Sequence, residues 1–334
     1  MYFRENTRYR KGVASVVIAI FLCFNLFSAT GAWADKHGKR QFLSIGTAPP
    51  GGAFFVVGGA IALVVGENVD DLNWEVTAEA TKGTQENIRR LARGELEFAL
   101  ANAAISYFAV RGEGAWKGEQ PIRAVMTLAP NVALFITPNS SGVTQIADMK
   151  GKRVVVGPAG AGFEYFLKPI LSAHGLTYED FTPLNNTQAG AVNMLADGSA
   201  AAAFLGGAVP TASITQAASS QDILFVPFDP EAKGRLINDY PFFESATIPA
   251  ETYRNQNIPF DGMNVGAMHL IASADQSEED VYQFTRILYE HRAEVVKKHP
   301  AGKAINPKNI VKDTGTTFHP GAVRYYKEIG IWHE

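Results

Sequence analysis

The feature that most constrains the fold is a repeated order of segments: a short apolar strand, a turn rich in glycine, and an apolar helix. It occurs first at residues 42–65, where the strand 42–47 runs into a glycine- and proline-rich turn ahead of a long apolar stretch. Gly51 and Gly52 allow the backbone positive φ angles and leave no side chain in the way of a ligand. Because the following helix begins with free N–H groups and the positive end of its dipole, the turn predicts a site for a small anion.

The next segments predict a parallel α/β lobe. A strand at 74–80 leads through a second glycine-containing turn into a helix, and another apolar strand follows at 98–101. Alternating strands and helices form parallel sheets, which bind ligands beyond the carboxyl ends of their strands. We therefore expect three turns to meet at one edge of the sheet, namely residues 48–54, 81–84 and 102–105.

A second lobe repeats this arrangement. The strand 154–156 enters the glycine-rich turn 157–163 before a helix, and a strand at 200–205 enters Gly206 and Gly207 before another. Any one of these turns, taken alone, is best interpreted as a plain connection between a strand and a helix. Their repetition in both lobes favours a ligand site.

Two crossovers are expected to connect the lobes. Strands at 122–128 and 132–137 are separated by only three residues, and the strand 268–272 returns the chain to the first lobe. The pattern predicts a two-lobed α/β clamp with a two-segment hinge. The expected boundaries are 1–34 for a signal peptide, 35–130 for the first lobe, 131–267 for the second lobe and 268–334 for the return to the first.

The N-terminal segment has the parts of a secretory signal. Four basic residues within the first eleven positions precede an apolar run at 13–28, and residues 32–34 read Ala-Trp-Ala. The run is shorter than the ~20 residues that usually span a bilayer. Cleavage after Ala34 is therefore favoured over the alternative, an uncleaved anchor. Cleavage also removes Cys23, the only cysteine, and a secreted chain without cysteines suits a bacterial periplasm.

Composition and motifs disfavour several function classes. A formal net charge of −3 without basic runs in the rest of the chain is unlike a nucleic-acid binder. Neither glycine-rich turn matches a nucleotide-binding motif, and the seven histidines are scattered without metal-ligand spacing. No nucleophile elbow or acid–base pair is recognisable. We predict no cofactor, no metal site and no enzyme activity.

Two polar side chains leave alternatives open. Glu164 opens the helix after the turn of the second lobe, where it either favours the helix dipole or binds a ligand ammonium group. Asn102 stands at the end of the strand 98–101 and is a candidate hydrogen-bonding group for a ligand.

Five ordered motifs resemble those of the TAXI family, the extracytoplasmic solute receptors of one class of TRAP transporter. They are GTAPPGGAFFVVG at 46–58, EATKGTQEN at 79–87, GKRV with GPAGAG within 151–162, LADG at 195–198 with Gly206, and HPGAVRYYKEIG at 319–330. The resemblance implies a periplasmic-binding-protein type II fold that closes on a small organic solute, typically an amino acid or a carboxylate such as glutamate or 2-oxoglutarate. It also implies delivery of that solute to a TRAP-type membrane permease driven by an ion gradient.

The chain departs from the family where side chains have lost polar groups. Alanine or phenylalanine replaces hydroxyl or carboxyl groups at six positions, while Thr84 keeps a hydroxyl: Ala53, Phe54, Ala104, Ala161, Phe163 and Ala201. Because an unpaired polar group in a pocket costs roughly 1–3 kcal/mol, these changes predict a less polar ligand than glutamate, such as an aromatic or branched carboxylate. Backbone N–H groups at 51–54 and 160–163 are expected to hold the carboxylate, with Phe54 and Phe163 packed on the rest.

The predicted ligand-binding residues are Gly51, Gly52, Ala53, Phe54, Thr81, Thr84, Asn102, Ala161, Gly162, Phe163, Glu164, Gly206 and Gly207. Two other functions remain open beside a monomeric transport receptor. One is a ligand-binding module that feeds a sensor kinase. The other is an enzyme on the same two-lobed fold, with Glu164 as its acid or base.

Overall fold

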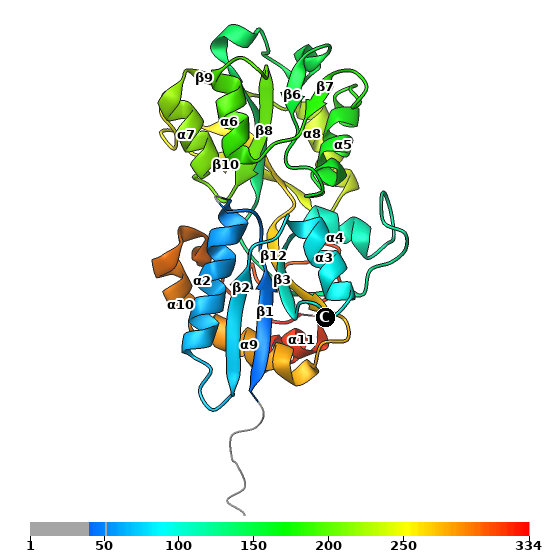
Figure 1. The fold of residues 1–334 in the computed structure, drawn as a ribbon, viewed down its shortest axis with the longest axis vertical. Helices are drawn as coiled ribbons and strands as arrows, with labels where there is room; N and C mark the ends of the chain where they lie inside the picture. Colours follow the sequence, from blue (N-terminus) through cyan, green and yellow to red (C-terminus); the bar gives the residue numbers. More distant parts are fainter. Residues whose placement is uncertain (1–39, 51, 334) are drawn as a thin grey trace, which may run out of the picture. The chain divides into compact units, whose positions relative to one another are not determined.

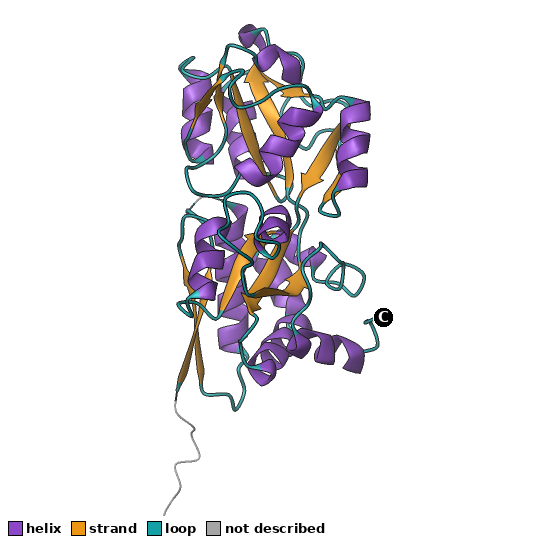
Figure 2. Cartoon of the chain, turned by 90° about the vertical axis from the view of Figure 1, so that its right-hand side faces the viewer, coloured by secondary structure: helices purple, strands orange, loops and turns teal. Residues whose placement is uncertain are grey.

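The computed structural model describes residues 40–50 and 52–333, in which the strands form two separate sheets (Figure 1). The predicted signal peptide and Gly51 lie outside the described residues. Helices pack on the faces of both sheets (Figure 2). The architecture is therefore the two-lobed α/β fold expected from the sequence.

The first sheet has the strand order β2-β1-β3-β12-β4. Its strands are β1 (Gln41–Gly46), β2 (Trp74–Glu79), β3 (Phe98–Asn102), β4 (Ile122–Thr127) and β12 (Met268–Ser273). Strand β1 pairs parallel with β2 and β3, whereas β12 runs antiparallel to both β3 and β4. The expectation of a parallel lobe is thus correct for the first three strands, and the returning strand β12, for which no direction is predicted from the sequence, makes the sheet mixed.

Six helices accompany the first sheet in the described part of the chain. They are α2 (Ala53–Glu67), α3 (Thr84–Ala92), α4 (Ala103–Ala109), α9 (Glu278–Glu290), α10 (Arg292–Lys298) and α11 (Pro320–Glu328). Helix α4 begins directly after β3, where the sequence predicted only a turn. Its start is fixed by Asn102, whose side-chain oxygen accepts hydrogen bonds from the N–H groups of Ala104 and Ile105. This is the geometry of an N-cap.

The second sheet has the strand order β10-β11-β5-β8-β6-β7, and β9 also pairs with β5. Its strands are β5 (Val132–Pro138), β6 (Arg153–Val155), β7 (Thr182–Leu184), β8 (Ala202–Gly207), β9 (Ile223–Val226), β10 (Phe243–Ile248) and β11 (Phe260–Val265). The neighbouring helices are α5 (Glu164–Ala173), α6 (Gln188–Ala196), α7 (Ala212–Ser220) and α8 (Pro230–Asp239). Short 3₁₀ turns occupy Asn139–Ser141, Ile146–Met149 and Pro300–Ala304.

The chain changes sheet between β4 and β5 and again between β11 and β12. These two connections are hydrogen-bonded to each other: the Val265 N–H donates to the Asn131 oxygen at 3.0 Å, and the Met268 N–H donates to the Ala129 oxygen at 2.9 Å. The paired connections form a short double-stranded bridge between the sheets.

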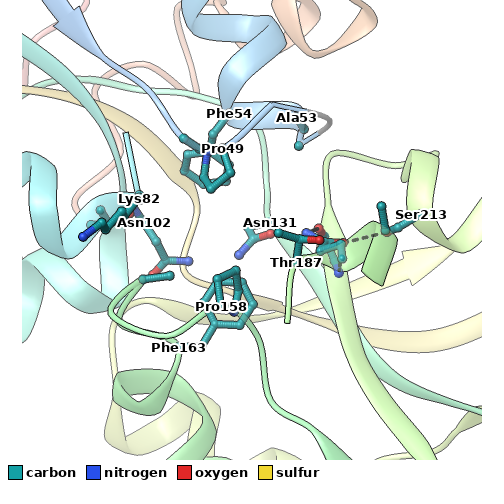
Figure 3. Close-up of a pocket in the computed structure, with 18 of the residues that line it drawn as sticks. Pro49, Ala53, Phe54, Lys82, Asn102, Asn131, Pro158, Phe163, Thr187 and Ser213 are labelled. Atoms are coloured by element: carbon teal, nitrogen blue, oxygen red, sulfur yellow. Dashed lines mark hydrogen bonds between the residues drawn. The ribbon is translucent and has the colours of Figure 1, made fainter. Parts of the chain in front are cut away.

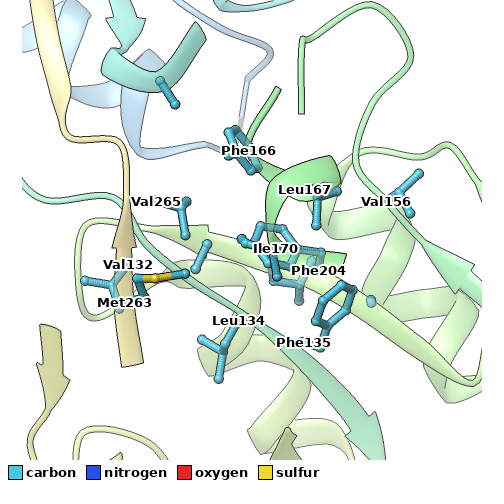
Figure 4. Packing of buried hydrophobic residues seen from close by; sticks show 14 of the residues in the cluster. Val132, Leu134, Phe135, Val156, Phe166, Leu167, Ile170, Phe204, Met263 and Val265 are labelled. Carbon is cyan, nitrogen blue, oxygen red and sulfur yellow. The ribbon is translucent and has the colours of Figure 1, made fainter. Parts of the chain in front are cut away.

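Each lobe has its own apolar centre. In the first, the rings of Phe98 and Phe284 stack with centroids 4.1 Å apart, which joins β3 to α9. In the second, the ring of Phe135 meets that of Phe204 edge to face at 4.9 Å (Figure 4). Burying a large apolar side chain contributes about 1.5–3 kcal/mol, so these clusters hold the sheets and helices that position the site. Among the described residues, no helix is long and apolar enough to cross a membrane.

Candidate functional site

A cavity of about 360 Å³ is lined by residues from both lobes (Figure 3). The three turns expected at the edge of the first sheet all contribute to it, through residues such as Pro49, Gly83 and Ile105. The second lobe contributes Pro158, Gln188 and neighbouring residues. A volume of this size fits a small organic molecule.

Eight of the predicted ligand-binding residues line this cavity: Gly52, Ala53, Phe54, Thr84, Asn102, Ala161, Phe163 and Gly206. Thr81, Gly162, Glu164 and Gly207 are not among its lining residues. The Thr81 hydroxyl donates to the Thr47 oxygen and accepts from the Gly83 N–H, both at 3.1 Å, so it shapes the turn. Gly162 lets the lobes approach, because a Cβ there would lie 2.9 Å from the Ile105 side chain of the first lobe.

Glu164 lies elsewhere. It lines a second, open cavity of about 610 Å³ together with Tyr165, Lys168 and Arg235. The suggestion that Glu164 binds a ligand ammonium group in the cleft therefore has no support from its position. Since Glu164 is in the first turn of α5, the remaining interpretation is a favourable interaction with the helix dipole.

Five helices of eight or more residues begin at the cavity, in the part of the chain that is described. Their first turns or the residues just before them line it, at α2, α3, α5, α6 and α7. Four of these helices, α2, α3, α5 and α7, have no side-chain N-cap. The N–H groups of Ala53 and Phe54 form no hydrogen bond with any described residue. Uncapped helix starts concentrate partial positive charge, so the cavity favours an anion.

Two apolar surfaces face each other across the cavity. Pro49 and Phe54 of the first lobe lie on one side, and Pro158 and Phe163 of the second lobe lie on the other (Figure 3). Flat rings on both sides suit a flat or compact apolar group between them.

Asn102 has no free hydrogen-bonding group for a ligand. Its side-chain nitrogen donates to the Gly266 oxygen at 2.9 Å and to the Val265 oxygen at 3.3 Å, while its oxygen caps α4. The expectation that this amide contacts a ligand therefore conflicts with its bonding. It joins the end of β3 to the second connection between the lobes.

Two other polar lining residues are also engaged within the protein. The Gln188 side chain exchanges hydrogen bonds with both backbone groups of Gly206, at 2.8 and 3.2 Å, and accepts one from the Ser213 hydroxyl at 2.6 Å. Thr84 differs, because its hydroxyl accepts from the Asn102 N–H at 3.0 Å and keeps its own proton to donate.

Asn131 is a lining residue that the sequence interpretation missed. It is only 8% exposed, its side chain forms no hydrogen bond with any described residue, and its amide projects toward the centre of the cavity (Figure 3). The signal is its place as a polar residue between two adjacent strands of different lobes. From the sequence, residues 129–131 predict only a connection between the lobes.

Charge in the cavity is sparse. Lys82, which is exposed, is the one charged residue among the described residues that line it. No group of three or more potential metal ligands occurs in the described part of the chain. The arrangement can attract and enclose an anion, and none of its side chains forms an acid–base pair.

Solved structures with this fold include periplasmic proteins. A protein from Bordetella bronchiseptica matches with a TM-score of 0.53 at 16% identity, over 88% of this chain and 90% of its own. A binding protein component of an ABC phosphonate transporter from Pseudomonas aeruginosa matches with a TM-score of 0.52 at 10% identity, over 86% and 94%. A periplasmic transporter protein matches with a TM-score of 0.50 at 14% identity, over 89% and 94%. At these identities the likeness establishes the fold.

The sequence itself matches one family model, and the match covers residues 45–330. This range includes the second sheet, the first sheet apart from residues 41–44 of β1, the paired connections and every described residue that lines the cavity. The chain therefore belongs to the NMT1-like family.

Proposed function

We propose that this protein is an extracytoplasmic solute receptor that captures a small organic carboxylate between its two lobes. The observation that carries the proposal is the convergence of uncapped helix starts on one largely apolar cavity. Such starts bind anionic groups through backbone N–H groups, which needs no charged side chain. The scarcity of charged lining residues fits this mode of binding.

The mechanism is closure of a clamp. Lining residues come from both lobes, so a ligand that contacts both favours the closed state over the open one. The paired connections at Asn131 and Val265 are the expected hinge. Capture and release break no covalent bond, so we propose a receptor and not an enzyme. The boundaries 35–130, 131–267 and 268–334 remain our proposal for the lobes, and the sheet membership of the strands supports them.

The body of the ligand is aromatic or branched and apolar. Pro49, Phe54, Pro158 and Phe163 surround the space that it would occupy. This agrees with the loss of polar side chains at positions such as 53 and 161. A carboxylate held by N–H groups and an apolar body held by rings together define the ligand class.

Its place in the cell follows from the N-terminal sequence and the family resemblance. The signal-like segment supports secretion to the periplasm, and the fold is shared with a periplasmic transporter protein. The resemblance to TAXI receptors supports delivery to a TRAP-type permease by a monomeric receptor. The phosphonate-transporter component of the same fold adds phosphonates as an anion class to be tested.

A ligand screen tests the proposal. Protein expressed from the full-length sequence is heated with amino acids, dicarboxylates, 2-oxo acids, aromatic and branched carboxylates, and alkyl and aryl phosphonates. A ligand that binds only the folded state raises the melting temperature. We expect the largest rise in melting temperature with aromatic or branched carboxylates. A rise only with phosphonates would show that the anionic group of the ligand is a phosphonate and not a carboxylate.

A matched pair of variants shows where the anion binds. Ala53→Asp places a negative charge at the start of α2, where it suits the helix dipole and repels a second anion. Ala53→Ser, which adds no charge, is the control. We expect the Asp variant to keep its melting temperature without ligand and to lose the ligand-induced rise. An unchanged ligand-induced rise in the melting temperature of the Asp variant would show that the anion does not bind at the start of α2.

An uptake experiment in cells distinguishes a transport receptor from a receptor that serves a sensor. Deletion of the gene should abolish uptake of the radiolabelled ligand identified in the screen. If uptake continues while ligand-dependent gene expression is lost, the protein serves a sensor.

A further inference from the structure

The cavity has no partner for an ammonium group. None of the described residues that line it is Asp or Glu, and the nearby Glu164 lines the other cavity. The starts of α2, α6 and α7, which have no acidic residue in the first turn, and Lys82 contribute positive charge or partial charge. A ligand ammonium would lose its hydration there without gaining a counter-charge, which is strongly unfavourable.

Asn131 provides a neutral hydrogen-bonding group in the same cavity. Its backbone is held from both sides, because its N–H donates to the Asn264 side-chain oxygen at 3.0 Å and its oxygen accepts from the Val265 N–H at 3.0 Å. The residue is only 8% exposed, and its side-chain amide is directed into the cavity without a hydrogen-bond partner among the described residues. The amide is therefore available to a ligand, and a hydrogen bond formed with it contributes about 0.5–1.5 kcal/mol to binding.

We propose that the ligand is a carboxylate without an ammonium group, which presents a neutral oxygen, carbonyl or hydroxyl, to the amide of Asn131. This inference rests on the proposed function, since it names the ligand class of the same site. Asn131 then favours 2-oxo and 2-hydroxy acids over the unsubstituted acid, while the absence of Asp and Glu among the described lining residues disfavours the amino acid.

Matched ligands test this directly by calorimetry at pH 7.5. One set is phenylpyruvate, 3-phenyllactate, phenylalanine and 3-phenylpropionate, and the branched set is 4-methyl-2-oxopentanoate, 2-hydroxy-4-methylpentanoate, leucine and 4-methylpentanoate. The members of a set differ only at the carbon beside the carboxylate. We expect the oxo or hydroxy acid to bind about tenfold tighter than the unsubstituted acid. The amino acid should bind weakest of all.

Two variants of Asn131 test whether its amide causes these differences in affinity. Asn131→Leu removes the amide at similar volume, so the oxo and hydroxy acids should lose their advantage over the unsubstituted acid. Asn131→Asp supplies the missing carboxylate, so the amino acid should gain affinity while the oxo acid loses it. Gln216→Glu adds the same charge at an exposed lining position and is the control. Melting temperatures without ligand establish that each variant is folded.

The outcomes separate the two proposals. If wild-type protein binds the amino acid as tightly as the oxo acid, or if Asn131→Asp leaves the order of affinities unchanged, this inference is overturned and the receptor stands. If no carboxylate binds at all, both the inference and the proposed ligand class are overturned.

Discussion

The hydroxyl of Tyr165 accepts a hydrogen bond from the backbone N–H of Ala115 at 3.2 Å. Tyr165 belongs to α5 of the second lobe, whereas Ala115 lies in the segment that follows α4 of the first. The buried ring of Trp116 stacks on the Tyr165 ring with centroids 5.9 Å apart. Gly114, with φ of +71°, brings the backbone so close that a Cβ there would lie 2.7 Å from the same ring. The lobes thus touch at a second place, outside the ligand cavity.

Tyr165→Phe should weaken ligand binding without touching the ligand. The variant keeps the ring stacking and removes one hydrogen bond between the lobes, worth about 1 kcal/mol. Because that bond is made only when the lobes are together, its loss favours the open state. We expect all ligands to bind about fivefold weaker by calorimetry.

Tyr178→Phe is the matched control for this change. Its ring packs on Phe181 within the second lobe, and its hydroxyl has no hydrogen-bond partner among the described residues. Affinity should stay at the wild-type value. Equal losses in the two variants would show that the contact at Ala115 does not bias closure.

Replacement by alanine should change the free energy of unfolding much more at Asn102 than at Asn131, although both residues line the cleft. Asn102→Ala removes an N-cap and the donor to Val265 and Gly266, so we expect a loss of about 2–3 kcal/mol in the free energy of unfolding. Asn131→Ala removes a side chain without protein partners, and should change unfolding by less than about 0.5 kcal/mol. Urea titrations measure both. A larger loss for Asn131 would mean that its amide stabilises the fold.

Neighbouring glycines of α2 provide a third comparison. A Cβ at Gly58 would collide with the Thr47 side chain, while a Cβ at Gly59 meets nothing within 4 Å. Gly58→Ala should therefore destabilise the protein by more than about 1 kcal/mol through overpacking of the helix on the sheet. Gly59→Ala should stabilise it by about 0.5–1 kcal/mol. Thermal unfolding of the two variants tests the packing of α2, and similar shifts would contradict it.

The stability of the protein should fall as the pH is lowered below 6.5. His269 is fully buried on β12, where burial lowers its pKa to about 3, and the only hydrogen bond of its side chain with a described residue joins Nε2 to the Ser106 hydroxyl at 2.8 Å. The unfolded chain binds a proton near pH 6.5 and the folded protein does not until about pH 3. Between these values the unfolded state holds more protons, so the free energy of unfolding decreases by about 1.4 kcal/mol per pH unit.

His269→Gln isolates this contribution. Burial also lowers the pKa values of His174, His299 and His319, which act in the same direction. The difference between wild type and variant should therefore shrink from pH 7 to pH 5 in urea titrations. Parallel pH profiles would assign the acid sensitivity to the other histidines.

Much of the fold was predictable because local sequence and tertiary position agree. The strands at Phe42 and Val154 and the helix after Gly52 follow from apolar runs that end at glycine-rich turns. Strands β7, β9, β10 and β11 and helix α8 were missed. Strand β10, for example, is buried only at its ends, Phe243 and Ile248, contains Glu244 and follows no glycine-rich turn. Its structure depends on pairing with β11, which is a non-local interaction.

The cavity was predictable in outline and not in its polar detail. Glycine-rich turns predicted where backbone N–H groups would gather, because that depends on local conformation. Whether an amide faces a ligand or a carbonyl depends on residues far away in sequence. Asn102 ends β3 and Asn131 directly precedes β5, so both lie at the end of a strand, yet the Gly266 oxygen accepts a hydrogen bond only from the amide of Asn102.

The order of strands in the first sheet has a consequence for how the chain acquires its structure during synthesis. Strand β12 lies between β3 and β4 and pairs with both. As the polypeptide emerges from its N-terminus, β3 and β4 therefore remain open edges until residues 268–273 are available. The second sheet has by then been synthesised in full. The first lobe to be translated is the last to be completed, and a nascent chain shorter than this carries unpaired strand edges that favour association with other chains.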